Sequence, residues 1–438
     1  MGMKLFGTSG IRGVVNEEIT PELALKVGMA VGTYINGDIA VGHDPRTSSV
    51  LLKNTVISGI LSCGENVYDI GLVPTPTTGI AIEAFGCKAG VTITASHNPP
   101  EYNGIKLWNR EGVAFSEEEK IIEELVFTEN FKLQKWNKLG TVSYKHDEAL
   151  KKHSEKIRKN IILKKNHKVV IDCGNAAASV FSPRVFRKLG NDVISINADP
   201  HGYFSRGLEP NEKNLEQLME TVETTGAELG IAHDGDADRV GIIDEKGEYV
   251  DYDVILALIA SYVLDEGDTF ITTVDASIKI DKYLEKYSIS VQRARVGDVA
   301  VAKEIKSMNA SFGGEPSGTW IFPDYQMTPD GIYSGARVLE MKEQRGDICE
   351  LKKKVPNYPI LREKIPCENR EKEKKMREIE KKLTQYNNVN KIDGFRVNLK
   401  DSWFLIRPSG TEPYIRITCE GKTGKKAKKI MGECKELF

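Results

Sequence analysis

Residues 38–48 read DIAVGHDPRTS, an apolar strand that ends in a polar turn with small hydroxyl residues. A helix-period stretch and a second strand follow, and a third strand leads into the loop of residues 90–104, GVTITASHNPPEYNG. The same order of elements begins again at residue 168 with KVVIDCGNAAAS and closes at residues 228–239 with ELGIAHDGDADR. A weaker third pass starts at residue 269 and ends in ASFGGEPSGT. Strands that alternate with helices predict parallel α/β units, so we expect three similar domains of this kind.

The pattern changes in the last part of the chain. Residues 368–383 are a strongly charged helical stretch, which we interpret as a solvated helix. Two β-like runs, at 402–406 and 414–420, flank the loop RPSGTEP, and a lysine-rich helix follows them. The predicted fold class is α/β, with mixed, largely parallel sheets in three similar domains and a C-terminal α+β domain. The expected boundaries are 1–147, 148–250, 251–356 and 357–438.

The composition excludes several classes of function. The 438 residues are 40% hydrophobic and 28% charged, with a formal net charge of -2, so no bulk attraction to nucleic acid or a membrane surface is expected. The longest apolar stretch, residues 254–264, is too short to span a bilayer and predicts a buried helix. No signal peptide is visible, and seven cysteines without a CxxC pair indicate reduced thiols. We expect a cytoplasmic globular protein.

The loop DGDADR carries Asp234, Asp236 and Asp238 at alternate positions directly after an apolar strand. Crowded carboxylates suit a hard cation such as Mg²⁺ or Ca²⁺, which also relieves their mutual repulsion. An EF-hand is rejected because Arg239 stands where its sharp turn requires glycine. An acidic surface turn is the plainer alternative. However, a surface turn rarely places three aspartates directly after a buried strand with no lysine beside them.

The loop TASHNPPEYNGIK places Ser96 and His97 between an apolar strand and a proline pair. A hydrolase dyad is not favoured, because adjacent side chains seldom point at each other and no GxSxG elbow is present. Taken alone, Ser96 is more often a turn-forming hydroxyl. Lys106 follows an Asn-Gly turn and, taken alone, is more often a solvated strand lysine.

The loop RPSGTEP combines Arg407 with Ser409, Gly410 and Thr411. Arginine offers a fork of donors to phosphate, and hydroxyls and backbone amides can complete a cradle. The loop is not a Walker motif, because a strand follows it and no GK[ST] is present.

Two further glycine-bounded loops carry polar side chains. GGEPSGT holds Glu315 and Ser317, which suit hydrogen bonds to neutral sugar hydroxyls, and GTSGIRG holds Arg12. Each loop is a weak signal alone. The loops TASHNPPEYNG, DGDADR and GGEPSGT each close one of the three passes of the repeat. Ligands collect at the carboxyl ends of parallel strands, so three such loops at equivalent strand ends predict one shared site.

Four motifs, TASHNP, DGDADR, GEPSGT and RPSGTEP, occur in this order and one per expected domain. On these motifs the chain resembles the α-D-phosphohexomutase family along nearly its whole length. That family includes phosphoglucomutases, phosphomannomutases and phosphoglucosamine mutases. The resemblance implies four domains around a central cleft, in agreement with the repeat.

The resemblance also implies roles for these residues. Ser96 would be a phosphoserine that donates and recovers the phosphoryl group, and one of its oxygens would hold Mg²⁺ together with the three aspartates. For Lys106, a plausible general base or acid, burial beside cationic neighbours is expected to lower its pKa. The remaining implied contacts are Glu315 and Ser317 with sugar hydroxyls, Arg407, Ser409, Gly410 and Thr411 with the phosphate that is not reacting, and Arg12, His97, Lys106 and Arg239 around the reacting phosphate.

The sequence also bears on the choice of sugar. RVGDVAVA has Asp298 after Gly297, a form similar to phosphoglucosamine mutases and related archaeal enzymes, where many relatives have Gly-His. An acidic residue here could favour an ammonium group at C2, cap the next helix, or do both. The loop GEPSGT has Pro316 and Thr319 where bacterial phosphoglucosamine mutases usually have the glutamine and histidine of GEQSGH.

We therefore expect interconversion of glucosamine 6-phosphate and glucosamine 1-phosphate. Phosphomannomutase/phosphoglucomutase activity is the alternative. From another class, a non-catalytic sugar-phosphate-binding protein on the same scaffold is a further alternative. A phosphatase that hydrolyses its phosphoserine is disfavoured, since it would need water in a cleft built to exclude it.

Overall fold

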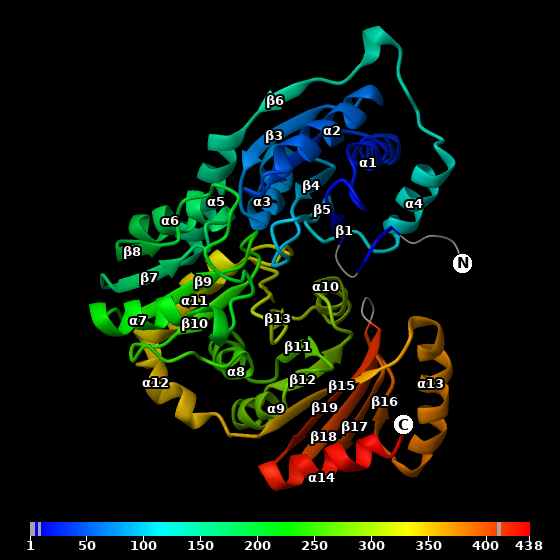
Figure 1. Cartoon of the computed structure of the whole chain (residues 1–438). Helices are drawn as coiled ribbons and strands as arrows, with labels where there is room; N and C mark the ends of the chain where they lie inside the picture. Colours follow the sequence, from blue (N-terminus) through cyan, green and yellow to red (C-terminus); the bar gives the residue numbers. More distant parts are fainter. Residues whose placement is uncertain (1–4, 8–9, 410–412) are drawn as a thin grey trace. The chain divides into compact units, whose positions relative to one another are not determined.

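The computed structural model describes residues 5–7, 10–409 and 413–438. Its internal contacts divide the chain into two compact units. The first unit comprises Met1–Val250 and Ser317–Glu350, and the second comprises Asp251–Pro316 and Leu351–Phe438. Figure 1 labels helices and strands of both units, although β2 and β14 carry no label there.

The first unit contains a six-stranded sheet in the order β1-β5-β4-β2-β3-β6 and a four-stranded sheet in the order β10-β9-β7-β8. The strands of the first sheet are β1 (Ile11–Val14), β2 (Ile39–His43), β3 (Val67–Leu72), β4 (Ala89–Ile93), β5 (Tyr102–Asn109) and β6 (Val142–Tyr144). Those of the second are β7 (Lys168–Asp172), β8 (Asp192–Ile196), β9 (Leu229–His233) and β10 (Val240–Ile243). The helices are α1 (Pro21–Tyr34), α2 (Ser49–Ser62), α3 (Thr75–Phe85), α4 (Glu118–Thr128), α5 (His146–Asn160), α6 (Ser182–Lys188), α7 (Glu216–Thr225) and α11 (Gly331–Arg345), with β14 (Trp320–Ile321) before α11 and α12 (Ile348–Leu351) at the boundary of the units.

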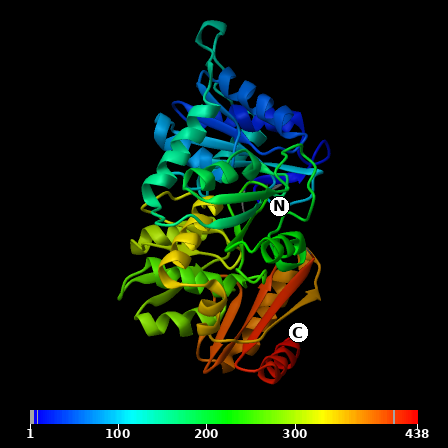
Figure 2. The same cartoon turned by 90° about the vertical axis from the view of Figure 1, so that its left-hand side faces the viewer.

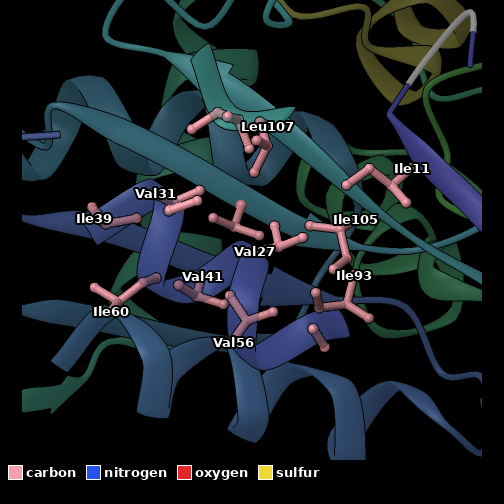
Figure 3. Packing of buried hydrophobic residues seen from close by; sticks show 14 of the residues in the cluster. Ile11, Val27, Val31, Ile39, Val41, Val56, Ile60, Ile93, Ile105 and Leu107 are labelled. Carbon is pink, nitrogen blue, oxygen red and sulfur yellow. The ribbon is translucent and has the colours of Figure 1, made fainter. Parts of the chain in front are cut away.

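Helices α1 and α2 cover one face of the six-stranded sheet and form the main hydrophobic core there. The two helices approach closely because Gly28 of α1 lies against the backbone of Val56, where an added Cβ would come within 2.3 Å of the carbonyl oxygen. Side chains alternate between the two faces of a strand, and Gly42 and Gly90 face Thr78 of α3. Helix α3 therefore covers the opposite face. Figure 3 shows the core cluster, with Val27, Val31, Val56 and Ile60 from the helices and Ile11, Ile39, Val41, Ile93, Ile105 and Leu107 from the strands.

The two sheets of the first unit carry polar loops at matching positions. Residues 94–101 connect the antiparallel strands β4 and β5, and residues 234–239 connect the antiparallel strands β9 and β10. β4 runs parallel to β2, and β9 runs parallel to β7. Both loops thus leave the carboxyl end of a strand in the parallel part of its sheet, as the repeat in the sequence predicts.

The second unit combines a parallel sheet with an antiparallel one. β11 pairs in parallel with β12 and β13, and the antiparallel sheet has the order β15-β19-β18-β17-β16. The strands are β11 (Thr269–Thr273), β12 (Ser290–Ala294), β13 (Gly313–Gly314), β15 (Ile360–Pro366), β16 (Val389–Asn390), β17 (Phe395–Leu399), β18 (Ser402–Pro408) and β19 (Tyr414–Gly421). The helices are α8 (Tyr252–Val263), α9 (Ile278–Leu284), α10 (Asp298–Met308), α13 (Asn369–Lys382) and α14 (Gly424–Lys435).

Alternation along β18 explains how the antiparallel sheet is packed. Phe404 and Ile406 point into a core shared with α13 and α14, whereas Trp403 and Leu405 pack with Val274 on the other face. Figure 2 shows this sheet in orange and red with α14 beside it.

These elements confirm the predicted fold class. The buried helix expected at 254–264 is α8, and the charged helix expected at 368–383 is α13. Asp298 was expected as a possible cap of the next helix, but Gly297 occupies the cap position and Asp298 is the first residue of α10. The four domain boundaries stay a prediction. Across the part of the chain that the structure describes, no helix combines the length and apolarity needed to cross a membrane.

Candidate active site

Ser96 lies in the β4–β5 loop in a conformation that is unusual for a non-glycine residue. It is 1% exposed, and its φ of 51° is in the left-handed region, which costs roughly 1 kcal/mol or more for an L-residue. Its backbone N–H donates to Thr94 Oγ1 at 2.9 Å. Its hydroxyl donates to Asp234 Oδ2 at 2.7 Å. The loop after β4 and the loop after β9 therefore meet at this hydroxyl.

The three aspartates of the β9–β10 loop form a buried cluster. One carboxylate oxygen from each of Asp234, Asp236 and Asp238 lies within 4.8 Å of the others. Burial, together with the charges of Asp238 and Asp236, raises the pKa of Asp234 well above its usual value. Within the described residues, Asp236 Oδ1 and Asp238 Oδ1 are buried and have no hydrogen-bond partner. Buried carboxylate oxygens without partners are costly, and a hard divalent cation would satisfy them, so these residues fit a metal site.

Lys106 of β5 binds this cluster directly. Its ammonium Nζ lies 2.7 Å from Asp236 Oδ2 and 2.7 Å from Asp238 Oδ2, and the side chain is 3% exposed. The prediction of a lowered pKa for Lys106 is wrong: burial lowers it, but the charges of Asp236 and Asp238 raise it by more, so the net shift is upward. In this arrangement Lys106 is an ammonium group and can donate a proton rather than accept one.

Arg12 and His97 both lie close to Ser96 or to another residue of its loop. β1 pairs with β5, which places Arg12 opposite Gly104, and Arg12 Nη1 donates to Asn98 Oδ1 at 3.2 Å. His97 Nδ1 lies 3.3 Å from Ser96 Oγ, so these adjacent side chains do approach each other, contrary to the sequence-based expectation. Burial and then the charges of Arg239 and Arg12 lower the pKa of His97 to about 3, so the imidazole is neutral at physiological pH.

Two residues that the sequence did not indicate complete this group. Thr75, the first residue of α3, donates through Oγ1 to Asp236 Oδ2 at 2.5 Å and through its N–H to the Asp236 carbonyl at 2.8 Å. Glu209 accepts from Arg239 Nη1 at 2.8 and 2.9 Å, and its Oε2 lies 3.6 Å from His97 Nδ1. Thr75 follows the carboxyl end of β3, where ligand-binding residues of parallel sheets collect, so the sequence pattern could have indicated it. Glu209 lies in an irregular segment that carries no such signal.

Ser317 belongs to the first unit and lies beside the metal loop. Its Oγ is 3.3 Å from Thr319 Oγ1, and Thr319 forms a β-bridge with Arg239. Backbone pairing thus brings the predicted sugar-binding serine next to a residue expected at the reacting phosphate.

In the second unit, Glu315 and Arg407 are connected through two neighbouring backbone amides. Arg407 Nε lies 2.9 Å from Asp393 Oδ2, which also accepts from the Val296 N–H at 3.2 Å. The next amide, that of Gly297, donates to Glu315 Oε1 at 2.7 Å. Asp393 was not indicated by the sequence, although it joins two of the predicted motifs.

The remaining predicted residues belong to the β18–β19 connection. The Ser409 N–H donates to the Tyr414 carbonyl at 3.1 Å, and the Ser409 carbonyl accepts from Lys372 Nζ at 2.6 Å. Gly410 and Thr411 lie outside the described residues.

The sequence matches one family along nearly its whole length. The matches are to phosphoglucomutase/phosphomannomutase alpha/beta/alpha domain I at residues 3–133, domain II at 147–247, domain III at 251–358, and the C-terminal domain at 363–437. The chain belongs to this phosphoglucomutase/phosphomannomutase family, so the family predicted from the four motifs is confirmed.

Individual proteins within this family are similar to the chain over nearly its whole length. The chain is 52% identical to a probable phosphoglucosamine mutase of Pyrococcus abyssi, over 99% of this chain and 97% of the relative. It is 48% identical to a probable phosphoglucosamine mutase of Methanothermobacter thermautotrophicus, over 98% of this chain and 96% of the relative. Among solved structures, a phosphoglucomutase/phosphomannomutase family protein from Burkholderia thailandensis matches with a TM-score of 0.90 at 26% identity, covering 98% of this chain and 96% of that one.

Proposed function

We propose that the chain interconverts glucosamine 6-phosphate and glucosamine 1-phosphate, with Ser96 as the carrier of the phosphoryl group. The observation that carries this proposal is the hydrogen bond of 2.7 Å from the Ser96 hydroxyl to Asp234, within a buried carboxylate cluster. A serine that only formed a turn would not need to point its hydroxyl into such a cluster. The names of the relatives that are about 50% identical support the amino sugar.

The proposed reaction has two transfers. The phosphoserine at Ser96 gives its group to the sugar phosphate, the resulting bisphosphate turns end for end, and its other phosphate returns to Ser96. Phosphoryl transfer depends mostly on positioning and on neutralisation of charge. Arg12 and Arg239 would surround the reacting phosphate with guanidinium groups. Lys106 would donate a proton from Nζ to Ser96 Oγ as the serine P–O bond breaks, and the proton that the attacking sugar hydroxyl releases would return to Nζ.

Asp234, Asp236 and Asp238 would hold Mg²⁺ together with an oxygen of the phosphoserine. When bound, this ion would supply neutralisation of the negative charge on the phosphoryl group. The unpartnered oxygens of Asp236 and Asp238 support this assignment. Glu315 would contact sugar hydroxyls, and Arg407 would contact the phosphate that is not reacting.

We expect Mg²⁺ to raise the thermal unfolding temperature of the protein, and Asp236→Asn to remove most of that increase. At a concentration 100 times its Kd, a ligand that binds only the folded state adds about 2.7 kcal/mol of stability. Thermal melts with Mg²⁺ and with EDTA measure the difference. The matched control is Asp192→Asn, an exposed aspartate at the start of β8, which should keep the full Mg²⁺ effect. An equal effect in both variants would remove Asp236 from the metal site.

The proposed preference for an amino sugar rests on two carboxylates in the second unit. Asp298 directly follows Gly297, whose N–H donates to Glu315. The backbone thus brings Asp298 near a residue expected at the sugar hydroxyls. An ammonium group at C2 would gain both an ion pair and a hydrogen bond from a carboxylate there, whereas a neutral hydroxyl would gain the hydrogen bond alone.

A comparison of kcat/KM on glucosamine, glucose and mannose 1-phosphates tests this choice. We expect glucosamine 1-phosphate to be converted at least ~10-fold more efficiently, which corresponds to about 1.4 kcal/mol of differential binding. Asp298→Asn should reduce this preference and leave glucose 1-phosphate almost unaffected. If glucosamine 1-phosphate is the slowest substrate, the phosphomannomutase/phosphoglucomutase alternative holds. Binding without turnover of any of the three would favour the non-catalytic alternative.

A further inference from the structure

Arg46 is a fully buried arginine in the turn that follows β2. Its side chain is 0% exposed, so it touches no solvent and no substrate. A guanidinium group has five N–H donors, and here all five are used. Nε donates to Asp44 Oδ2 at 2.9 Å. The other four donate to backbone carbonyls: Ser96 at 2.9 Å, Asn98 at 2.7 Å and Pro99 at 2.5 Å in the β4–β5 loop, and Tyr102 at 3.0 Å at the start of β5.

The loop is therefore folded around one cation. The carbonyls of Ser96, Asn98 and Pro99 point inward to Arg46, and a buried carbonyl without a donor is costly. Lysine could not replace this arrangement, because an ammonium group has only three donors and lacks the planar fork.

Asp44 holds the same loop from its other side. Asp44 Oδ2 accepts from Thr94 Oγ1 at 2.7 Å, and Thr94 Oγ1 accepts from the Ser96 N–H at 2.9 Å. Ser96 is thus tied at its N–H through Thr94 and Asp44, and at its carbonyl by Arg46. These ties fix the backbone on both sides of a residue whose φ is 51°.

A similar pair occurs in the second repeat. Arg206 Nε donates to Asp172 Oδ2 at 2.8 Å, and its Nη2 donates to the carbonyl of His233 at 2.8 Å. His233 is the residue before Asp234, the first carboxylate of the metal loop. Asp172 ends β7 as Asp44 follows β2, the corresponding strand of the first sheet. The repetition makes an incidental packing role for Arg46 a poor explanation.

We propose that Arg46, together with Asp44, is the positioning pair that holds Ser96 in the geometry for phosphoryl transfer. This inference rests on the proposed role of Ser96 as the phosphate carrier. Arg46 acts only through the loop, so its loss should slow the transfer step and leave substrate binding almost unchanged.

The test compares Arg46→Lys with the wild type in phosphate uptake at Ser96 from glucose 1,6-bisphosphate. In this step a P–O bond of the sugar breaks, a P–Oγ bond to Ser96 forms, and the serine proton passes to the departing sugar oxygen. Intact mass over time gives the rate per folded molecule. A displacement of reacting groups by about 1 Å can cost ~10²-fold in rate, so we expect a loss of this size in uptake and kcat, with KM within about threefold of the wild type.

The matched control is Lys53→Gln. Lys53 of α2 also forms a buried ion pair, with its Nζ 2.6 Å from Asp69 Oδ2. Asp69 lies in β3 and not at the Ser96 loop. It should lower stability without lowering uptake per folded molecule. If Arg46→Lys does not fold, Asp44→Asn carries the same test, because it keeps the guanidinium inside the loop.

The outcomes separate the two ideas. If the wild type takes up phosphate on Ser96 and both Arg46→Lys and Asp44→Asn do so at the wild-type rate, the inference is overturned. If KM rises while kcat is kept, Arg46 affects binding and the inference is also overturned. If the wild type takes up no phosphate on Ser96, the proposed function fails, and this inference fails with it.

Discussion

Ser96→Ala is expected to lower turnover by roughly 10⁴-fold or more, because the loss of a nucleophile that forms a covalent intermediate costs up to about 10⁶-fold in other enzymes. The variant should also lose the phosphate seen in intact mass after incubation with glucose 1,6-bisphosphate. Its fold should persist, because the backbone ties of Ser96 to Arg46 and Thr94 do not involve the hydroxyl.

The control for this result is Ser154→Ala, which removes another buried serine hydroxyl, in α5. This variant should keep both phosphate uptake and turnover. A phosphate that remains on the Ser96→Ala protein would show that another residue carries it, and the proposed role of Ser96 would be wrong.

Lys106→Met is expected to have the second-largest effect, and its effect on stability should depend on Mg²⁺. Without metal, the substitution leaves Asp236 and Asp238 buried without their cation, and loss of one partner of a buried ion pair costs about 3–5 kcal/mol. With saturating Mg²⁺, the ion would supply positive charge to the same carboxylates, so the loss should shrink. With Mg²⁺ present, turnover should fall by ~10²–10⁴-fold, as expected for a proton donor.

Denaturant titrations in EDTA and in Mg²⁺ measure the two free energies of unfolding. Lys106→Arg serves as the control, since it keeps the positive charge and should keep more of the stability in EDTA. If the Lys106→Met protein is destabilised equally in both solutions, Mg²⁺ does not share the carboxylates that Lys106 binds.

The loops of the candidate site could be predicted because local signals mark them. Apolar runs precede both DGDADR and TASHNP, and in the structure both loops do follow buried strands, β9 and β4. The side chains of such loops converge because the carboxyl ends of parallel strands share one edge of a sheet.

Long-range electrostatics explains what could not be predicted. The pKa of Lys106 was expected to fall because cationic neighbours were assumed, but its direct partners are carboxylates that lie 130 and 132 residues further along the chain. Arg46 and Glu209 were missed for a related reason. Apart from Asp44, the partners of Arg46 come from a separate segment, as do those of Glu209, and no spacing in the sequence indicates such contacts.

The distance along the chain between Lys106 and its carboxylates has a consequence for the synthesis of the protein. The aspartates leave the ribosome 130 residues after the lysine, which at 5–20 residues per second is a delay on the order of ten seconds. During that time the hydrophobic core of the first sheet can form. The ammonium group of Lys106 has no carboxylate partner yet, so its burial is unfavourable and it is expected to stay in contact with water. Closure of the nascent first domain around β5 is thus expected to wait for the second domain, so that the last step of its folding and the assembly of the acidic loop become one event.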